Sequence, residues 1–139
     1  MNNTYSVKYK GKPYDFSNGE KTLLENNLIL IARDTPFAYE YYVWPAGTAE
    51  ELMNTSPKKA TACAIFHKES SILRLRTVFT NPSYRHMGLA TYLICLGLKR
   101  ACELGIHENI PLLDASDIPG FYNKYTFMNG YHIGDNYTY

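Results

Sequence analysis

The segment from residue 71 to residue 104 constrains the fold more than any other part of the sequence. Ser71 to Thr80 alternates between apolar and polar residues, which predicts a strand, and Asn81-Pro82 ends it. Gly88 to Leu104 has the apolar spacing of a helix, and Gly105 is placed to terminate it. Because this helix is apolar on most of its sides, most of it must be buried.

The alternation within the strand also predicts which residues share a face. One face carries Leu73, Leu75, Thr77 and Phe79, and the other carries Arg74, Arg76, Val78 and Thr80. The two arginines are therefore expected in line with Val78 and Thr80.

The junction between this strand and this helix is suited to bind an anion. It consists of Tyr84, Arg85, His86, Met87, Gly88, Leu89 and Ala90. The first N–H groups of a helix have no partner within the helix, and the helix dipole favours negative charge beside them. A phosphate group is therefore the expected ligand.

The surrounding segments predict an α/β domain. Val7 to Tyr14 indicates a short hairpin, Ala60 to Phe66 pairs with the strand from Ser71, and Ile110 to Leu113 is a further short strand. A helix that connects two strands of one sheet makes them parallel, so the sheet is expected to be mixed, with helices on its faces. At 139 residues the chain fits a single domain.

The composition of the chain excludes several classes of protein. With 45% hydrophobic and 19% charged residues, it has the composition of a globular domain rather than of a disordered or fibrous chain. No apolar run approaches the roughly 20 residues of a membrane span. Met1 to Lys10 is polar and lacks the apolar core of a signal peptide, so we expect a cytoplasmic protein with no membrane partner.

Charge and cysteine spacing exclude two further kinds of site. The net charge is +1 and no basic run is longer than a pair such as Lys58-Lys59, which argues against a nucleic-acid partner. Cys63, Cys95 and Cys102 form no Cys-x-x-Cys pair, which argues against zinc binding and dithiol redox chemistry. We therefore predict small apolar core residues at these positions and no metal site.

The junction resembles the acetyl-CoA signature of the GNAT superfamily of acetyl-CoA-dependent N-acetyltransferases. That signature is Arg/Gln-x-x-Gly-x-Gly/Ala, and it follows a strand that ends in Val-x-Pro-x-Tyr-Arg. Arg85, Gly88 and Ala90 match it, and Thr80 replaces the usual Val by a near-isostere.

A second segment carries the same resemblance. The family typically has a Tyr on a short helix, followed five residues later by the Phe of a Gly-Phe pair. Tyr122 and Phe127 have this spacing, and Thr126 stands where the Gly is usual. The resemblance covers Ala60 to Ile133, about half of the chain.

The resemblance implies acetyl-CoA as the co-substrate. In the family, the strand before the signature and the next parallel strand splay apart, and the pantetheine arm of the cofactor lies between them. Backbone groups of Val78, Phe79 and Thr80 would then bind pantetheine. The amides of the junction that would bind the pyrophosphate are those of Arg85, His86, Met87, Gly88, Leu89 and Ala90. A side chain larger than that of Gly88 is expected to clash with the pyrophosphate.

Acetyl transfer to an amine also needs stabilisation of an oxyanion and protonation of the departing thiolate. The backbone N–H of Phe79 or of a neighbour is the candidate donor to the oxyanion. The resemblance implies Tyr122 as the general acid that protonates the coenzyme A sulfur, a role that suits a phenol with a pKa of about 10. The alternative for Tyr122 is a packed aromatic residue whose hydroxyl is hydrogen-bonded.

The general base is left open. Some relatives carry Glu or His at the positions of Arg74 and Arg76, and Arg cannot act as a base. Either water relays the proton or another residue serves, and the candidates are His67, Glu69, Asp114 and His132. Arg74 and Arg76 are candidates to bind an acceptor that carries carboxylate or phosphate, and a solvated or salt-bridged strand face is the alternative.

Two segments of the first half are open to more than one interpretation. Leu28 to Ala32 is either a buried strand or the middle of a helix, because a short apolar run does not reveal its period. Phe37 to Trp44 is rich in aromatic residues, which either line an acceptor pocket or pack in the core or in a homodimer interface.

Three functional interpretations follow. The first is an N-acetyltransferase that moves the acetyl group of acetyl-CoA to a primary amine by direct attack, the acceptor being unidentified. The second is a GNAT-like module that binds acyl-CoA or a protein partner without catalysis. The third is the phosphate loop of another α/β fold, but the chain has neither a Gly-x-Gly-x-x-Gly nor a Gly-Lys-Ser/Thr element.

Overall fold

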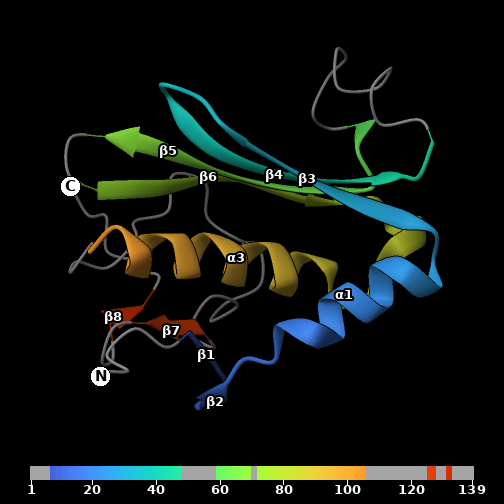
Figure 1. Cartoon of the computed structure of the whole chain (residues 1–139), viewed down its shortest axis with the longest axis horizontal. Coiled ribbons are helices and arrows are strands. Elements are labelled where there is room, and N and C mark those ends of the chain that lie inside the picture. Colours follow the sequence, from blue (N-terminus) through green and yellow to red (C-terminus); the bar gives the residue numbers. More distant parts are fainter. Residues whose placement is uncertain (1–6, 48–58, 70–71, 106–124, 128–130, 133–139) are drawn as a thin grey trace.

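The structure, a computed structural model, describes residues 7–47, 59–69, 72–105, 125–127 and 131–132. Within these residues the chain has an α+β fold of three layers (Figure 1). A four-stranded sheet forms the first layer, two helices form the second, and a smaller sheet of short strands forms the third. Among the described residues, no helix is long and apolar enough to cross a membrane.

The larger sheet contains β3 (Leu28–Asp34), β4 (Ala38–Pro45), β5 (Ala62–Glu69) and β6 (Ile72–Thr80), in that order. Each strand pairs with its neighbour in the antiparallel direction. The strand interpretation of residues 28–32 is therefore confirmed. The hairpin of β5 and β6 is confirmed too, although β5 extends to Glu69, beyond its predicted end at Phe66.

The expectation of a mixed sheet is wrong for the described strands, which are all paired antiparallel. Neighbouring parallel strands need a crossover between them, usually a helix. The described helices do not connect neighbouring strands of the larger sheet, because α1 precedes β3 and α3 follows β6. The strand expected at residues 110–113, which would have run parallel, lies outside the described residues. The described part is therefore α+β rather than α/β.

Helix α3 (Leu89–Glu103) packs across the larger sheet and ends one residue before the predicted end at Leu104. Gly105 has a φ of 74°, the left-handed conformation that ends many helices, and its N–H donates to the carbonyl of Cys102 at 3.1 Å. The helix approaches β5 closely at Gly97, where a Cβ atom would stand 2.1 Å from Phe66 Cε1. The absence of a side chain at Gly97 allows this contact.

The smaller sheet contains β2 (Lys12–Pro13), β1 (Lys8–Tyr9), β7 (Tyr125–Phe127) and β8 (Tyr131–His132), in that order. The hairpin predicted at residues 7–14 is confirmed as β1 and β2. Its turn residues Lys10 and Gly11 have φ values of 56° and 80°, as in a type I′ turn. The hairpin lies on the side of α3 opposite the larger sheet (Figure 1).

Helix α1 (Phe16–Glu25) has no counterpart among the predicted elements. Its N-cap is Asp15, whose Oδ1 accepts the hydroxyl of Ser17 at 2.6 Å and the backbone N–H of Ser17 at 3.0 Å. These hydrogen bonds lower the pKa of the Asp15 carboxyl. The helix packs beside α3 at Gly19, where a Cβ atom would stand 2.1 Å from the ring atom Cδ1 of Tyr92.

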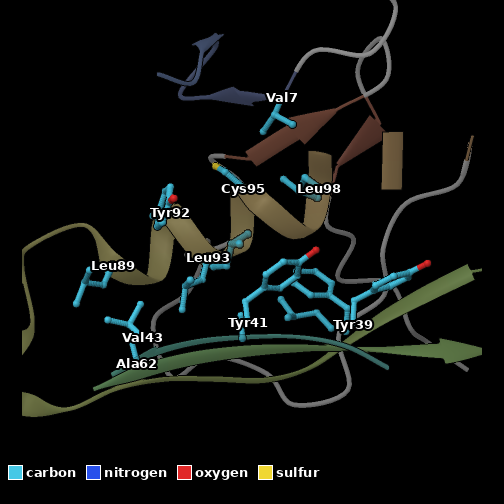
Figure 2. Close-up of a cluster of buried hydrophobic side chains, with 14 of the residues drawn as sticks. Val7, Tyr39, Tyr41, Val43, Ala62, Leu89, Tyr92, Leu93, Cys95 and Leu98 are labelled. Atoms are coloured by element: carbon cyan, nitrogen blue, oxygen red, sulfur yellow. The ribbon is translucent and has the colours of Figure 1, made fainter. Parts of the chain in front are cut away.

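The main hydrophobic core lies between α3 and the larger sheet and extends to the N-terminal hairpin (Figure 2). Tyr41 and Val43 of β4 point toward α3, and Val7 lies on the other side of this helix beside Cys95. A second cluster lies on the opposite face of the larger sheet and contains Tyr42, Trp44, Ala60 and Cys63. Both faces of the central strands are therefore buried.

The cysteines are buried, as predicted. The exposed fraction is 0% for Cys63 and Cys95 and 3% for Cys102. Burial raises the pKa of the Cys95 thiol to about 12, so this thiol stays protonated at neutral pH. The cysteines act here as small apolar core residues.

Strand β6 contains a β-bulge at Arg76. Ile65 of β5 pairs with Thr77, whereas the next residue, Phe66, pairs with Leu75. Arg76 is therefore the extra residue of β6, opposite no residue of β5. A bulge bends its strand and shifts the alternation of side chains beyond it.

Because of this bulge, the predicted faces of β6 are wrong at its carboxyl end. Leu73 and Leu75 pack in the main core with α3, and Val78 packs against the same core. Phe79 packs instead against the second cluster, on the opposite face. The arginines are therefore not in one line with Val78. The sequence alternates regularly through Arg76, so nothing in the pattern itself indicated the bulge.

Candidate functional site

A turn leads from the end of β6 into α3 and forms the predicted junction. Asn81 Oδ1 accepts the N–H of Ser83 at 3.0 Å, and Pro82–Tyr84 forms one turn of 3-10 helix (η2). His86 and Gly88 have φ values of 68° and 80°, both in the left-handed region, and Gly88 is the N-cap of α3. Two left-handed residues thus direct the chain from the sheet into the helix.

The N-terminus of α3 is open. Gly88 has no side chain that could accept a hydrogen bond from the first N–H groups, and the first turn of the helix contains no acidic residue. Apart from Gly88 and its two chain neighbours, no atom of the described residues lies within 4 Å of the position that a Cβ atom at Gly88 would take. The helix end therefore offers N–H donors and positive dipole potential to a ligand.

The helix end borders a cavity of about 660 Å³. Met87, Gly88 and Thr91 line it from the junction and α3. The opposite walls come from the hairpin of β1 and β2 and from the first turns of α1, and they include Tyr9, Lys10, Lys12, Tyr14, Asp15 and Asn18. This volume is in the range of pockets that bind small molecules and cofactors.

The remaining residues of the signature have different environments. Leu89 is buried in the main core with 2% of its surface exposed, so only its backbone faces the junction. Arg85 and His86 are exposed, and Arg85 Nε lies 3.5 Å from the carbonyl oxygen of Thr80. Ala90 is half-buried.

The outer edge of β6 is open within the described part of the chain, where no strand pairs with it. The N–H of Asn81 donates to the carbonyl of Thr61 at 2.8 Å, on the side of β5. Backbone groups alternate in direction along a strand, so those of Phe79 also point toward β5, whereas those of Val78 and Thr80 point to the outer edge. Of the backbone groups predicted to bind pantetheine or the oxyanion, those of Val78 and Thr80 thus point outward, and the Thr80 carbonyl also accepts a long hydrogen bond from Arg85 Nε.

The two arginines of β6 have different roles in the structure. Arg74 Nε forms a salt bridge with Glu69 Oε1 at 2.9 Å, and His67 is the register partner of Arg74 on β5. Arg76 is exposed at the bulge. Glu69 and His67, two candidates for the general base, therefore lie beside a bound guanidinium on the face away from α3.

The aromatic residues of β4 pack in the core. Tyr39, Tyr41, Tyr42 and Trp44 are buried, whereas Phe37, in the turn before β4, is 73% exposed. Burial raises the pKa of Tyr41 to about 12, and burial together with a hydrogen bond to Glu40 raises the pKa of Tyr42. Within the described residues these four side chains fill the core rather than line a pocket.

The remaining predicted residues fall wholly or partly outside the described part of the chain. Tyr122 and Asp114 lie outside the described residues, and of His132 the structure describes only the backbone in β8. Among the described residues, no group of three or more His, Cys, Asp or Glu side chains is arranged to hold a metal ion.

Sequence reasoning missed the second half of the cavity wall. The Lys10-Gly11-Lys12 turn was visible as a hairpin, but no local pattern indicated that this hairpin and α1 lie beside Gly88. In a comparison with known proteins, no family model, no curated protein and no solved structure matches this chain.

Proposed function

We propose that this chain is an acetyl-CoA-dependent N-acetyltransferase with a GNAT-like fold. One observation carries the proposal: the residues that match the acetyl-CoA signature lie at the N-terminus of a helix whose N-cap is glycine, directly after a strand whose outer edge no described strand covers. Gly88 has the left-handed conformation at the N-cap of α3, with open space in front of it. This arrangement suits the pyrophosphate of coenzyme A, a doubly charged anion that needs several N–H donors.

The donor would bind along two neighbouring elements. The amides from Arg85 to Ala90 would bind the pyrophosphate, and the outward backbone groups of Val78 and Thr80 would bind pantetheine as an added strand does. The open edge of β6 leads directly into the junction, so one extended molecule can contact both.

The chemistry would be direct attack of a neutral amine on the thioester carbonyl. The C–N bond forms, the carbonyl oxygen becomes an oxyanion, and the C–S bond then breaks. An outward N–H of Val78 or Thr80 would donate to the oxyanion, and Tyr122 would give its proton to the departing sulfur. The amine proton would leave to water, and water would return a proton to Tyr122, which regenerates the general acid. Glu69 is not free to take the amine proton, because it is held by Arg74.

Arg76 is the better candidate of the two arginines to bind an anionic acceptor, because it is exposed while Arg74 is in a salt bridge. The Arg76→Ala variant should raise the acceptor KM severalfold and leave the KM for acetyl-CoA unchanged. Arg33→Ala is the control, since Arg33 is a partly exposed arginine on the far strand β3. An unchanged acceptor KM in Arg76→Ala would rule out this role.

The function is tested by a thermal-shift titration with acetyl-CoA, followed by a thiol-release assay with small amines, peptide N-termini and lysine side chains as acceptors. Acetyl-CoA should raise the Tm, and at least one amine should release coenzyme A. Tyr122→Phe should slow transfer by roughly 10²- to 10⁴-fold without loss of acetyl-CoA binding.

Two outcomes would contradict the proposal in different ways. No stabilisation at millimolar acetyl-CoA would reject the donor site. Stabilisation without thiol release from any amine would instead support a non-catalytic module that binds acyl-CoA.

A further inference from the structure

The cavity beside α3 has a second wall that the acetyl-CoA signature does not include. The hairpin of β1 and β2 places Lys10 and Lys12 on the same cavity as Gly88 and Thr91. The hairpin and the helix end are about 75 residues apart in the sequence, so the tertiary fold alone brings them together.

This wall carries positive charge. Among the described residues, neither Lys10 nor Lys12 forms a salt bridge, and Lys10 Nζ lies 5.3 Å from the centre of the Tyr9 ring. The one carboxylate of the wall, Asp15, accepts hydrogen bonds from Ser17 at the start of α1. Two lysine cations and the N-terminus of α3 therefore give the cavity a positive electrostatic potential.

The same wall also offers flat apolar surface. Tyr9, Pro13 and Tyr14 line the cavity, and the rings of Tyr9 and Tyr14 are arranged edge to face at 6.4 Å. Aromatic and proline rings of this kind pack against planar groups of ligands. A ligand that fits both parts of the cavity carries negative charge at one end and a planar ring at the other.

We propose that this cavity binds a phosphorylated nucleoside. Its phosphate groups would lie between the two lysines and the N-terminus of α3, and its base would pack against Tyr9 and Tyr14. This ligand is either the nucleotide end of coenzyme A or a free nucleotide. The inference rests on the proposed function in the first case and is independent of it in the second.

The experiment measures the binding of ADP, acetyl-CoA and pantetheine by calorimetry. Lys10→Gln/Lys12→Gln removes both cavity lysines, and Lys8→Gln/Lys21→Gln is the matched control, because it removes the same charge from exposed positions that do not line the cavity. The cavity variant should have an affinity for ADP at least roughly tenfold lower than that of the unaltered chain, and the control should bind ADP as the unaltered chain does. Pantetheine, which has no nucleotide, should bind equally to all three.

The cavity variant distinguishes the two sources, because both ligands would use the N–H groups of α3 and ADP should displace acetyl-CoA in either case. If the ligand is the nucleotide end of coenzyme A, the cavity variant weakens the binding of acetyl-CoA as well as that of ADP. If it is a free nucleotide, the cavity variant weakens the binding of ADP and leaves the binding of acetyl-CoA unchanged. The inference is overturned if ADP does not bind at millimolar concentration, or if the two double variants lower the affinity for ADP equally. A chain that binds ADP through Lys10 and Lys12 but transfers no acetyl group would refute the proposed function and leave this inference standing.

Discussion

The N-termini of α1 and α3 border one cavity, yet they are capped differently. At α1, the Asp15 carboxylate accepts two hydrogen bonds from Ser17 and closes the helix end. At α3, the N-cap is Gly88, which has no side chain to accept a hydrogen bond from the first turn of the helix. A capped end gains stability from its own chain, whereas an uncapped end keeps its donors for a ligand. The difference is why we propose the ligand at α3 and not at α1.

The glycines near these two ends differ in the same sense. Gly19 of α1 is required for packing, because a Cβ atom there would overlap the ring of Tyr92. Gly88 faces open space and is required for its backbone conformation, with a φ of 80°. One glycine is therefore required by core packing, and the other by the backbone conformation of the candidate site.

Closing the end of α3 in the way that α1 is closed should have the largest effect. Gly88→Asp places a carboxylate on the open amides, where it occupies the donors and repels phosphate. We expect acetyl-CoA binding to fall at least about 100-fold, measured by calorimetry. Gly105→Asp is the control, because Gly105 has a similar φ of 74° and open space but lies at the other end of α3. Equal binding by the two variants would mean that this helix end does not hold the donor.

Gly19→Ala tests the packed glycine and should have the next largest effect. The new Cβ would stand 2.1 Å from Tyr92 Cδ1, so either the ring or α1 must move. Overpacking of this kind costs about 1–3 kcal/mol of unfolding free energy, which denaturant titration measures. The new Cβ of Gly88→Ala would meet no atom of a non-neighbouring described residue, so this change should cost only about 1 kcal/mol, from the left-handed backbone. If Gly88→Ala proved the more destabilising of the two, the assignment of packing and site roles to these glycines would be reversed.

Local patterns predicted the elements around α3 well. The helix from residue 88, the hairpin of β5 and β6 and the turn at Lys10-Gly11 depend on periodicity and turn residues that act over short range. Helix α1 was missed, because its apolar residues are few and its stability comes from packing against β3 and α3.

The site was predicted only in part, for the same reason. The glycine-capped helix end at Gly88 follows from local sequence, but the wall with Lys10 and Lys12 exists only through the tertiary fold. The bulge at Arg76 likewise depends on pairing with β5, and it reversed the predicted face of Phe79. The sequence pattern of one strand does not contain the register of its partner.

Removing the cap of α1 should have a smaller effect than overpacking its glycine. Asp15→Ala takes away the acceptor of both Ser17 hydrogen bonds, and we expect the Tm to fall by a few degrees. Acetyl-CoA binding should change little, because the donors at Gly88 remain. A loss of acetyl-CoA binding as large as that expected for Gly88→Asp would show that the two helix ends act as one site rather than two.

The smallest expected effect is a pH dependence of the Tm, which should come from the cap of α1 and not from the end of α3. The Ser17 hydrogen bonds lower the pKa of Asp15 below its ordinary value of 3.8, so the carboxylate stabilises the folded chain above this pH. The contribution is lost as the pH falls through the lowered pKa. Asn also caps helices but does not titrate, so the Tm difference between the unaltered chain and Asp15→Asn should shrink between pH 5 and about pH 2. The other carboxylates are common to both chains and cancel in this difference.

Gly88→Ala is the control for this pH dependence. Since Gly88 carries no titrating group, the Tm difference between the unaltered chain and Gly88→Ala should be independent of pH. A pH-dependent difference in this control would contradict the assignment of the titrating cap to α1 alone.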